Sequence, residues 1–586
     1  MDKKSIIGAG LCGVLLVAWF PLMNWMGWSG RPSAAPPQTA ATPAKPATPA
    51  AAPAGPAAAP LLPAAVPAAP EAPAGAAAPA RPLPLRQAGK FDALLDPASG
   101  GLTRVSLATY NEDDRKTPVC LGSDTTTPLG VLLPAGDAAA AKAWGPLRLV
   151  SATPDRILLE RQLPQGLRLR QEWRVSPDRP YLLECRISIA NPSAATVAYE
   201  PMWFSAGALS LPPGQAASGG LGMPSDLSAE MRLAGNGKLE SYTPKNIGKL
   251  KPDEAAKLAE TPLDWLALHT KYFTFLLTGG DHLPFAGARL GQAETRSDVA
   301  QPQLSVNGGA RLAGGSLLPG TETTRLLHVY AGPKEYKNLK AMGNGADSLL
   351  QMDLFFFFHP GWMGWISQQV LQFMVTLHDH LKSSWAYGLA IIIITLIVKL
   401  LFWPLTHYST MSMKRMQVLQ PQITAVREKY KDDPRRQQEK IMEVYRENKV
   451  NPMGGCLPML LQIPVFFALF NVFRGAIELR HSTFLWVTDL AQPDTLPWMP
   501  FGLPIRPLAI LMAATMFLQQ KLTPSAMDPA QAKMMMIMTL FFSFLFYSMP
   551  AGLTLYWTVN QALGIVQMLL IHRMITLHPA PVAAKA

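Results

Sequence analysis

One apolar stretch of the chain, residues 389–404, contains a single charged residue, Lys399. The stretch is long enough to belong to a membrane span, because roughly 20 apolar residues cross the hydrocarbon core of a bilayer as a helix. A cation inside such a segment is costly, and it usually faces a water-filled cavity or a polar partner. We therefore expect an integral membrane protein in which Lys399 is the first candidate functional residue.

The apolar segments are unevenly distributed along the 586 residues, with one near the N-terminus and the others after residue 350. Residues 1–28 are expected to form a transmembrane anchor, because lysines precede an apolar run that ends in tryptophans. A cleaved signal peptide is the alternative, since small residues follow near Ser33. Residues 29–85 are nearly all Ala and Pro, a composition that cannot bury a core, and we expect an extended linker there.

Residues 86–345 are expected to form a soluble all-β domain of the sandwich type. Apolar and polar residues alternate at 167–170, 173–175 and 183–189, and turn residues separate many such short runs. No catalytic triad, paired-carboxylate motif or phosphate loop occurs in this region. We therefore expect that the chain is not an enzyme and needs no cofactor or metal.

The histidines and cysteines of this domain do not form a pattern that is typical of a metal site. His269, His282 and His328 are interpreted as ordinary polar residues. Cys120 and Cys185 are interpreted as two separate buried thiols, and a disulfide between them is the alternative.

Residues 346–384 are expected to form an amphipathic helix in the membrane interface, with aromatic residues toward the lipid. The adjacent residues His378-Asp379-His380 resemble metal ligands in type only. Because successive helical residues point to different faces, we do not expect them to bind one ion.

Residues 385–586 are expected to contribute five further spans, which makes six with the anchor: 385–404, 454–473, 508–519, 534–549 and 552–571. The loop at 406–451 is rich in Lys and Arg, so the positive-inside rule predicts that it is cytoplasmic. Both termini are then cytoplasmic and the β-domain lies outside. The net charge of +12 is interpreted in the same way, as a sign of orientation rather than of nucleic-acid binding.

Residues 406–451 are expected to form a helical hairpin. Met416, Leu419, Ile423, Val426 and Tyr430 have the three-four spacing of one helix face, and Asp432-Asp433-Pro434 predicts the break before a second helix. The basic exterior of the hairpin is suited to contact with ribosomal RNA or with anionic lipid.

Several polar residues join Lys399 in the predicted spans. Thr395 lies one turn before Lys399 and thus on the same helix face. Placed around one bundle interior, these side chains would form a hydrated groove with one cation. The alternative is that they are hydrogen-bonding contacts between helices, which are common in membrane bundles. The polar residues of the other spans are Gln462, Gln519, Gln520, Tyr556, Trp557, Asn560, Gln561 and Gln567.

Several motifs in this region resemble the bacterial YidC membrane-protein insertase family, of the Gram-negative type with a large periplasmic domain. The motifs are Ile391 to Lys399 with Trp403-Pro-Leu405, Met416-Gln-Val-Leu-Gln-Pro421, Asn451-Pro-Met-Gly-Gly-Cys-Leu-Pro458, Gln462-Ile-Pro-Val-Phe466, Glu478-Leu-Arg480, Pro550-Ala-Gly-Leu-Thr-Leu-Tyr-Trp557 and, in the β-domain, Tyr330-Ala-Gly-Pro-Lys334.

The resemblance implies a five-helix insertase core, a periplasmic supersandwich and a bacterial inner-membrane location. It also implies a groove that receives the hydrophilic tails of nascent membrane proteins, with the Sec translocon as a partner and the ribosome as a partner of the hairpin. The family's groove cation corresponds to Lys399, where many relatives have arginine; its polar threonine corresponds to Thr395 and its last-span aromatic to Trp557. A small-solute transporter that uses Lys399 as a counter-ion is the alternative function.

Overall fold

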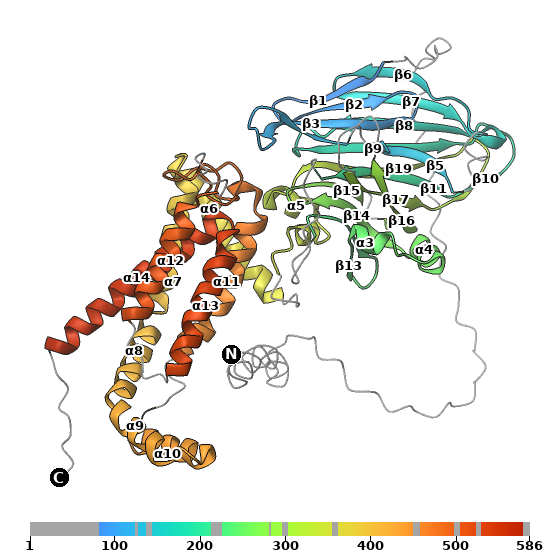
Figure 1. Cartoon of the computed structure of the whole chain (residues 1–586). Helices are drawn as coiled ribbons and strands as arrows, with labels where there is room; N and C mark the ends of the chain where they lie inside the picture. Colours follow the sequence, from blue (N-terminus) through green and yellow to red (C-terminus); the bar gives the residue numbers. More distant parts are fainter. Residues whose placement is uncertain are drawn as a thin grey trace, which may run out of the picture.

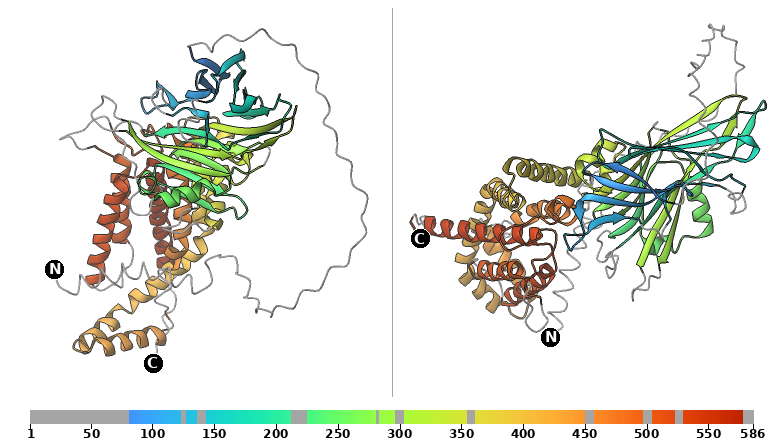
Figure 2. Two further views of the ribbon diagram at one scale, coloured as in Figure 1. Left: turned by 90° about the vertical axis from the view of Figure 1, so that its right-hand side faces the viewer. Right: turned by 90° about the horizontal axis from the view of Figure 1, so that it is seen from above.

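The computed structural model describes eleven parts of the chain: residues 81–122, 127–135, 143–211, 225–280, 283–295, 303–353, 361–448, 450, 457–496, 504–522 and 529–577. The predicted anchor at 1–28 and almost all of the predicted linker at 29–85 lie outside these residues. Within the described part, a β-domain lies at one end of a bundle of helices, and a helical hairpin lies at the other end (Figure 1, Figure 2).

The β-domain contains two large sheets, as the alternating runs predict. The first has the strand order β1-β2-β3-β5-β11-β17-β16, with β4 paired to β3. Its strands are β1 (Leu83–Gln87), β2 (Phe91–Asp96), β3 (Gly101–Asn111), β4 (Pro118–Leu121), β5 (Leu129–Pro134), β11 (Met202–Ser210), β16 (Gly287–Thr295) and β17 (Gln303–Leu312).

The second large sheet has the order β13-β12-β14-β15-β19-β9-β8-β7-β6. Its strands are β6 (Arg148–Thr153), β7 (Arg156–Gln162), β8 (Arg168–Val175), β9 (Leu182–Ala190), β12 (Leu227–Leu233), β13 (Leu239–Tyr242), β14 (Leu263–Thr270), β15 (Phe273–Gly279) and β19 (Glu322–Pro333). A further small sheet pairs β10 (Val197–Tyr199) with β18 (Gly315–Leu317).

The alternation in β8 shows how the sequence places the core of this domain. Leu169, Gln171 and Trp173 are buried, whereas the arginines of the strand, Arg168, Arg170 and Arg174, are exposed. Trp173 packs against Phe204 of β11, with ring centroids 6.2 Å apart, so the two sheets meet face to face. The predicted sandwich is therefore confirmed.

Cys185 is fully buried in β9, and Cys120 in β4 is partly exposed; both are free thiols, as interpreted from the sequence.

Short helices border the β-domain. They are η1 (Pro164–Gly166), α3 (Pro244–Ile247), α4 (Pro252–Ala259), α5 (Tyr336–Met342) and η2 (Ala346–Leu350).

The helical part begins with α6 and ends with α14. Its helices are α6 (Gly361–Leu381), α7 (Ala386–Leu401), α8 (Trp403–Val418), α9 (Gln420–Lys429), α10 (Pro434–Glu447), α11 (Leu457–Gly475), η4 (Ile477–Leu479), α12 (Pro507–Leu522), α13 (Pro529–Tyr547) and α14 (Ala551–Leu577). The five spans predicted after residue 385 coincide in position with α7, α11, α12, α13 and α14.

None of the described helices alone has both the length and the hydropathy that a membrane span needs, but α7 and α8 together have the length and composition of a span that is bent by 60° at its break. Pro404 lies in the first turn of α8 and removes a backbone donor there, which accounts for the break. The six-span topology and the cytoplasmic position of both termini stay predictions.

Helix α6 is amphipathic, as the sequence predicts for 346–384. Met363, Leu371 and Met374 are buried where α6 packs on α7 and α11, while Trp365 and Phe373 are exposed. Its position in a membrane interface stays a prediction.

Helices α8 and α9 form one arm and α10 the other arm of a helical hairpin, and the first arm is not one continuous helix; the cytoplasmic position of the hairpin stays a prediction. Helix α8 ends at Val418 and α9 begins at Gln420, because Pro421 occupies the first turn of α9. Leu419 and Ile423 of the first arm still pack against Ile441 of α10, as the three-four spacing predicts.

The β-domain and the helices are joined at the C-terminal end of α11. Arg474 pairs with Asp226 at 3.4 Å, and Arg480 pairs with Asp113 at 3.2 Å. Between these pairs, one carboxylate oxygen of Glu478 is buried without a hydrogen-bond partner among the described residues. Burial, and then the charge of nearby Glu335, raise the pKa of Glu478 to about 7.

Gly130 has a φ of +86°, and an added Cβ would lie 2.3 Å from Cζ2 of Trp173. We predict that Gly130→Ala lowers the free energy of unfolding by roughly 2–4 kcal/mol, because backbone strain and overpacking add. Gly89→Ala is the matched control, since Gly89 also has a positive φ but has nothing within 4 Å of its added Cβ. Thermal unfolding of the full chain in detergent measures both; equal losses would contradict the packing of Trp173 on β5.

Glu478 should make the folded chain less stable as pH rises from about 4.5 to 7, because the folded state holds the proton that the unfolded state has lost. Glu478→Gln should therefore stabilise the chain at pH 8, by of order 2 kcal/mol, and leave it nearly unchanged at pH 5. Denaturant unfolding at the two pH values measures this. Glu322→Gln, at an exposed carboxylate of β19, should show no such difference between pH 5 and pH 8.

Candidate functional site

Lys399 lies in the last turn of α7, where helix carbonyl groups favour a cation. Its Nζ atom is close to α12 and α14: a Cβ added to Gly564 would be 3.5 Å from Lys399 Nζ and 3.2 Å from Gln519 Nε2. An added Cβ would be in ordinary contact with the ammonium group and slightly tight against the amide. Lys399 and Gln519 thus both lie next to Gly564, and their role in a groove stays a prediction.

The Lys399 ammonium has no carboxylate within ion-pair distance among the residues that the structure describes. The side chain is half-buried, whereas its neighbours Leu400 and Leu401 are 67% and 71% exposed on the outer face of the bundle. An unpaired charge in apolar surroundings is costly unless water or an anion solvates it. This arrangement thus favours a site that a negatively charged group can enter.

Thr395 lies one turn before Lys399 and is buried, as expected for the same face of α7. Its hydroxyl donates a hydrogen bond to the carbonyl oxygen of Ile391, with an oxygen–oxygen distance of 2.6 Å. Only the acceptor lone pairs of Thr395 are then available to another molecule.

Three buried polar atoms of α14 have no hydrogen-bond partner among the described residues: the Tyr556 hydroxyl, Trp557 Nε1 and Asn560 Oδ1. Gln462 of α11 lies close to the Tyr556 hydroxyl without forming a well-aligned hydrogen bond. Buried polar groups are normally paired, so three orphaned atoms within two turns indicate a region that needs water or a ligand.

Trp557 is held by an aromatic cluster that joins three helices. Its ring lies 5.2 Å from that of Phe466 in α11 and 5.0 Å from that of Phe546 in α13. The ring position is therefore fixed by packing, although its N–H has no partner in the described part of the chain.

Two predicted groove residues form hydrogen bonds between helices. Gln520 Oε1 accepts from the Thr539 hydroxyl at 3.2 Å, which joins α12 to α13. Gln567 Nε2 donates to the Thr406 hydroxyl at 2.8 Å, which joins α14 to α8. These two contacts agree with the alternative interpretation, in which the polar side chains form hydrogen bonds between helices. A role for Gln520 in a groove stays a prediction.

Gly564 is the site residue that sequence reasoning did not identify. A spacing of four residues from Asn560, and of eight from Tyr556, places it on the same face of α14. That spacing is the signal that would have found it.

His269 is buried in the β-domain, where its Nε2 lies 3.2 Å from the Ser228 hydroxyl and 3.3 Å from Glu230. Among the described residues, no group of three or more His, Cys, Asp or Glu side chains is arranged to hold a metal ion. His378 stacks on Tyr387 instead, with centroids 4.4 Å apart.

Two protein families match the chain. Residues 87–403 match the family described as YidC periplasmic domain, and residues 377–578 match the family described as 60Kd inner membrane protein. Together the two matches extend from the end of β1 to the end of α14.

Known relatives carry the name Membrane protein insertase YidC. The relative from Pelobacter propionicus is 42% identical over 348 residues, which cover 58% of this chain and 59% of that relative's own length. The relative from Syntrophobacter fumaroxidans is 35% identical over 441 residues, which cover 73% of each chain. A solved structure titled "Active YidC insertase crystal structure with the first transmembrane domain resolved" has 19% identity and a TM-score of 0.34, over 84% of this chain and 94% of that one.

The orphaned atoms of α14 predict that Asn560 faces water or a ligand despite being only 8% exposed, whereas Phe544 of α13 is 81% exposed on the outer face. N-ethylmaleimide reacts with the thiolate, which needs water to form. In a background with the four native cysteines replaced by alanine, Asn560→Cys in membranes should therefore react several-fold faster than Phe544→Cys. The reverse order would show that the interior of the bundle is dry.

Proposed function

Because the chain belongs to the YidC family, we propose that it inserts nascent proteins into the bacterial inner membrane and assists their folding there. Family membership rests on the match of the periplasmic-domain family to residues 87–403 and on the Syntrophobacter fumaroxidans relative. Both relatives reported above are named as insertases, which supports this function and gives no support to the solute-transporter alternative.

The Lys399 ammonium, which has no carboxylate within ion-pair distance among the described residues, is the single observation that carries the mechanism. Acidic groups in the short extracellular tail of a substrate would be attracted to this cation, because a low-dielectric site strengthens attraction between opposite charges. Gln519 and the orphaned polar atoms of α14 would hydrate the tail while it passes. The polar tail is thereby spared part of the cost of crossing hydrocarbon.

The outer face of the bundle next to Lys399 suits the apolar part of a substrate. Leu396, Ile397, Leu400 and Leu401 are all exposed on α7. Exposed methionines of α13, such as Met535 and Met536, add a polarisable surface that adapts to varied side chains. The substrate's apolar segment would move along this surface into lipid while its tail remains near Lys399.

The energy would come from partitioning into lipid and from the membrane potential, since the sequence contains no nucleotide-binding motif. The potential contributes roughly 2.3 kcal/mol for each charge moved through 100 mV.

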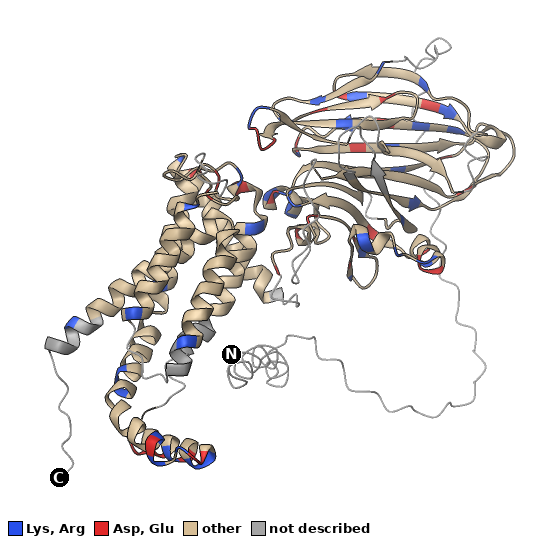
Figure 3. Cartoon of the chain, viewed as in Figure 1, with Lys and Arg blue, Asp and Glu red and all other residues tan. Residues whose placement is uncertain are grey.

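The arrangement of the parts supports the proposed orientation. The β-domain and the α9–α10 hairpin lie at opposite ends of the bundle (Figure 1, Figure 2). Charged residues gather on both of these parts, whereas the bundle between them is mostly uncharged (Figure 3). A bilayer around the bundle would place the β-domain in the periplasm and the hairpin in the cytoplasm, where it would meet the ribosome. The Sec translocon is a proposed partner for larger substrates.

We predict that Lys399→Arg retains insertion and that Lys399→Glu slows it on the order of tenfold, as for a change of about 1.4 kcal/mol in the attraction. The measurement is protease protection of a small single-span substrate with an acidic tail, in cells depleted of their own insertase. Lys521→Glu, at an exposed position near the end of α12, is the matched control and should insert normally.

A second experiment exchanges the charges of residue 399 and of the substrate tail. Replacing the acidic residues of the substrate tail by lysine should restore insertion by Lys399→Glu and slow insertion by the unchanged chain. Equal insertion of both substrates by both variants would reject the electrostatic step.

A further inference from the structure

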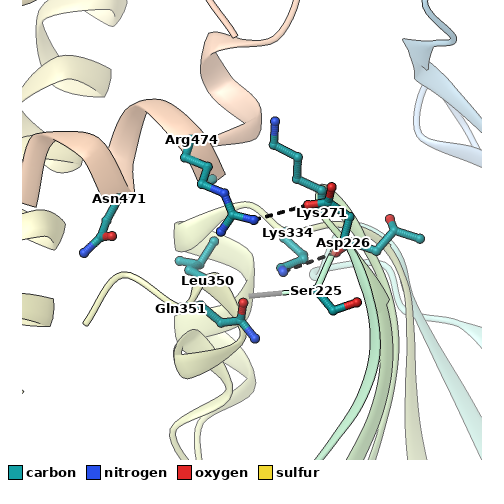
Figure 4. A pocket seen from close by; sticks show the side chains of 10 residues that line it. Ser225, Asp226, Lys271, Lys334, Leu350, Gln351, Asn471 and Arg474 are labelled. Atoms are coloured by element: carbon teal, nitrogen blue, oxygen red, sulfur yellow. Dashed lines mark hydrogen bonds and ion pairs between the residues drawn. The ribbon is translucent and has the colours of Figure 1, made fainter. Parts of the chain in front are cut away.

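A small pocket lies where the β-domain meets the end of α11 (Figure 4). Lys271 and Lys334 come from the β-domain, and Arg474 comes from the last turn of α11. Asp226 and Asn471 also line it. The pocket thus combines three cations with one carboxylate, on elements far apart in the sequence.

The carboxylates nearby do not balance these cations by direct contact. Asp226 pairs with Arg474 at 3.4 Å. Glu230, which lies behind Lys334, accepts a hydrogen bond from Gln351 at 3.3 Å and lies 3.3 Å from His269. Among the described residues, neither lysine has a carboxylate within ion-pair distance, and the pocket keeps an excess of positive charge.

Lys334 is only 4% exposed, which makes its charge expensive. Its Nζ atom lies 3.3 Å from the carbonyl oxygen of Thr270 and 3.4 Å from His269 Nδ1. An ammonium group has three protons, so at least one remains to be donated into the pocket.

The pKa values of the two lysines, Lys271 and Lys334, are lowered to about 8 each, mainly by burial. The charge of Arg474 adds to this lowering, whereas Asp226 opposes it at Lys271 and Glu230 opposes it at Lys334. A bound anion would stabilise both ammonium groups and would raise these pKa values again.

The size of the pocket limits what can bind. Its cavity volume of about 30 Å³ accommodates about two water-sized groups, which excludes a sugar or a nucleotide base. Two oxygens of a phosphate group fit this space and match lysine and arginine donors, so such a group would enter the pocket in part.

We propose that this pocket binds a phosphate group, and that the bound anion fastens the β-domain to α11. In the proposed orientation, the end of α11 lies at the outer surface of the bilayer, where phospholipid headgroups and free phosphate are both present. The binding site itself does not depend on the insertase function.

The test uses the full chain in dodecyl maltoside micelles at pH 7, with sodium phosphate compared with sodium chloride at constant ionic strength. Acetylation of individual lysines by acetic anhydride is followed by mass spectrometry. Phosphate should slow the acetylation of Lys271 several-fold and leave Lys337, an exposed lysine of α5, unchanged. Equal acetylation rates of Lys271 in the two salts would overturn the proposal, unless the experiment in phosphatidylglycerol nanodiscs shows that a lipid headgroup already occupies the pocket.

Variants give a second readout. Phosphate should raise the thermal unfolding temperature of the unchanged chain and of Lys337→Gln, and this shift should be lost in Lys271→Gln and in Arg474→Gln. A shift that persists in both pocket variants would overturn the proposal. If either variant does not fold, the protection of Lys271 from acetylation in the unchanged chain decides whether phosphate binds in the pocket.

Phosphatidylglycerol nanodiscs distinguish the two sources of phosphate. If a lipid headgroup occupies the pocket, Lys271 should already be protected in nanodiscs and added phosphate should have no further effect. If free phosphate is the ligand, added phosphate should protect Lys271 equally in nanodiscs and micelles. Unprotected Lys271 in nanodiscs, with no effect of phosphate in either medium, would reject both.

Discussion

The helical part of the molecule is organised around one positive charge that has no carboxylate beside it in the described chain. Helix α7 brings Lys399 next to Gly564 of α14. The amide of Gln519 also lies next to Gly564, and an amide can solvate a cation but cannot neutralise it. The site is therefore complete only with water or with an anionic group from another molecule.

Much of this arrangement could be predicted from the sequence, because its patterns are local. Alternation in β8 and β9 predicted the sandwich, and a lysine in an apolar run indicated the candidate site. The sequence could not show which partner satisfies each polar side chain. Thr539 and Thr406, which pair with Gln520 and Gln567, lie 19 and 161 residues away from them along the chain. Gly564 was missed for a related reason, since a glycine has no side chain to indicate a role.

The two halves of the molecule are joined at the end of α11 by charged groups and by a continuous apolar cluster, which includes Leu349 and Leu350 together with Ile477 and Leu479. The pairs Arg474–Asp226 and Arg480–Asp113 are partly exposed, so each contributes little to stability. Glu478, which lies between Arg474 and Arg480 in the sequence and has one buried carboxylate oxygen and a raised pKa, opposes the contact at neutral pH. This junction attaches the β-domain to the bundle. The bundle also contains aromatic contacts of its own, of which Phe466 and Trp557 are part.

The length of α7 has its own consequence. Its 16 residues extend about 24 Å at 1.5 Å per residue, and the chain then turns by 60° into α8. A typical hydrocarbon core is about 30 Å thick, so a bilayer that contacts this helix must compress to match it. Hydrophobic mismatch of this kind deforms lipid at modest cost. Beside Lys399 the apolar barrier would thus be thinner than elsewhere, and a polar segment crossing there would have a shorter distance to travel.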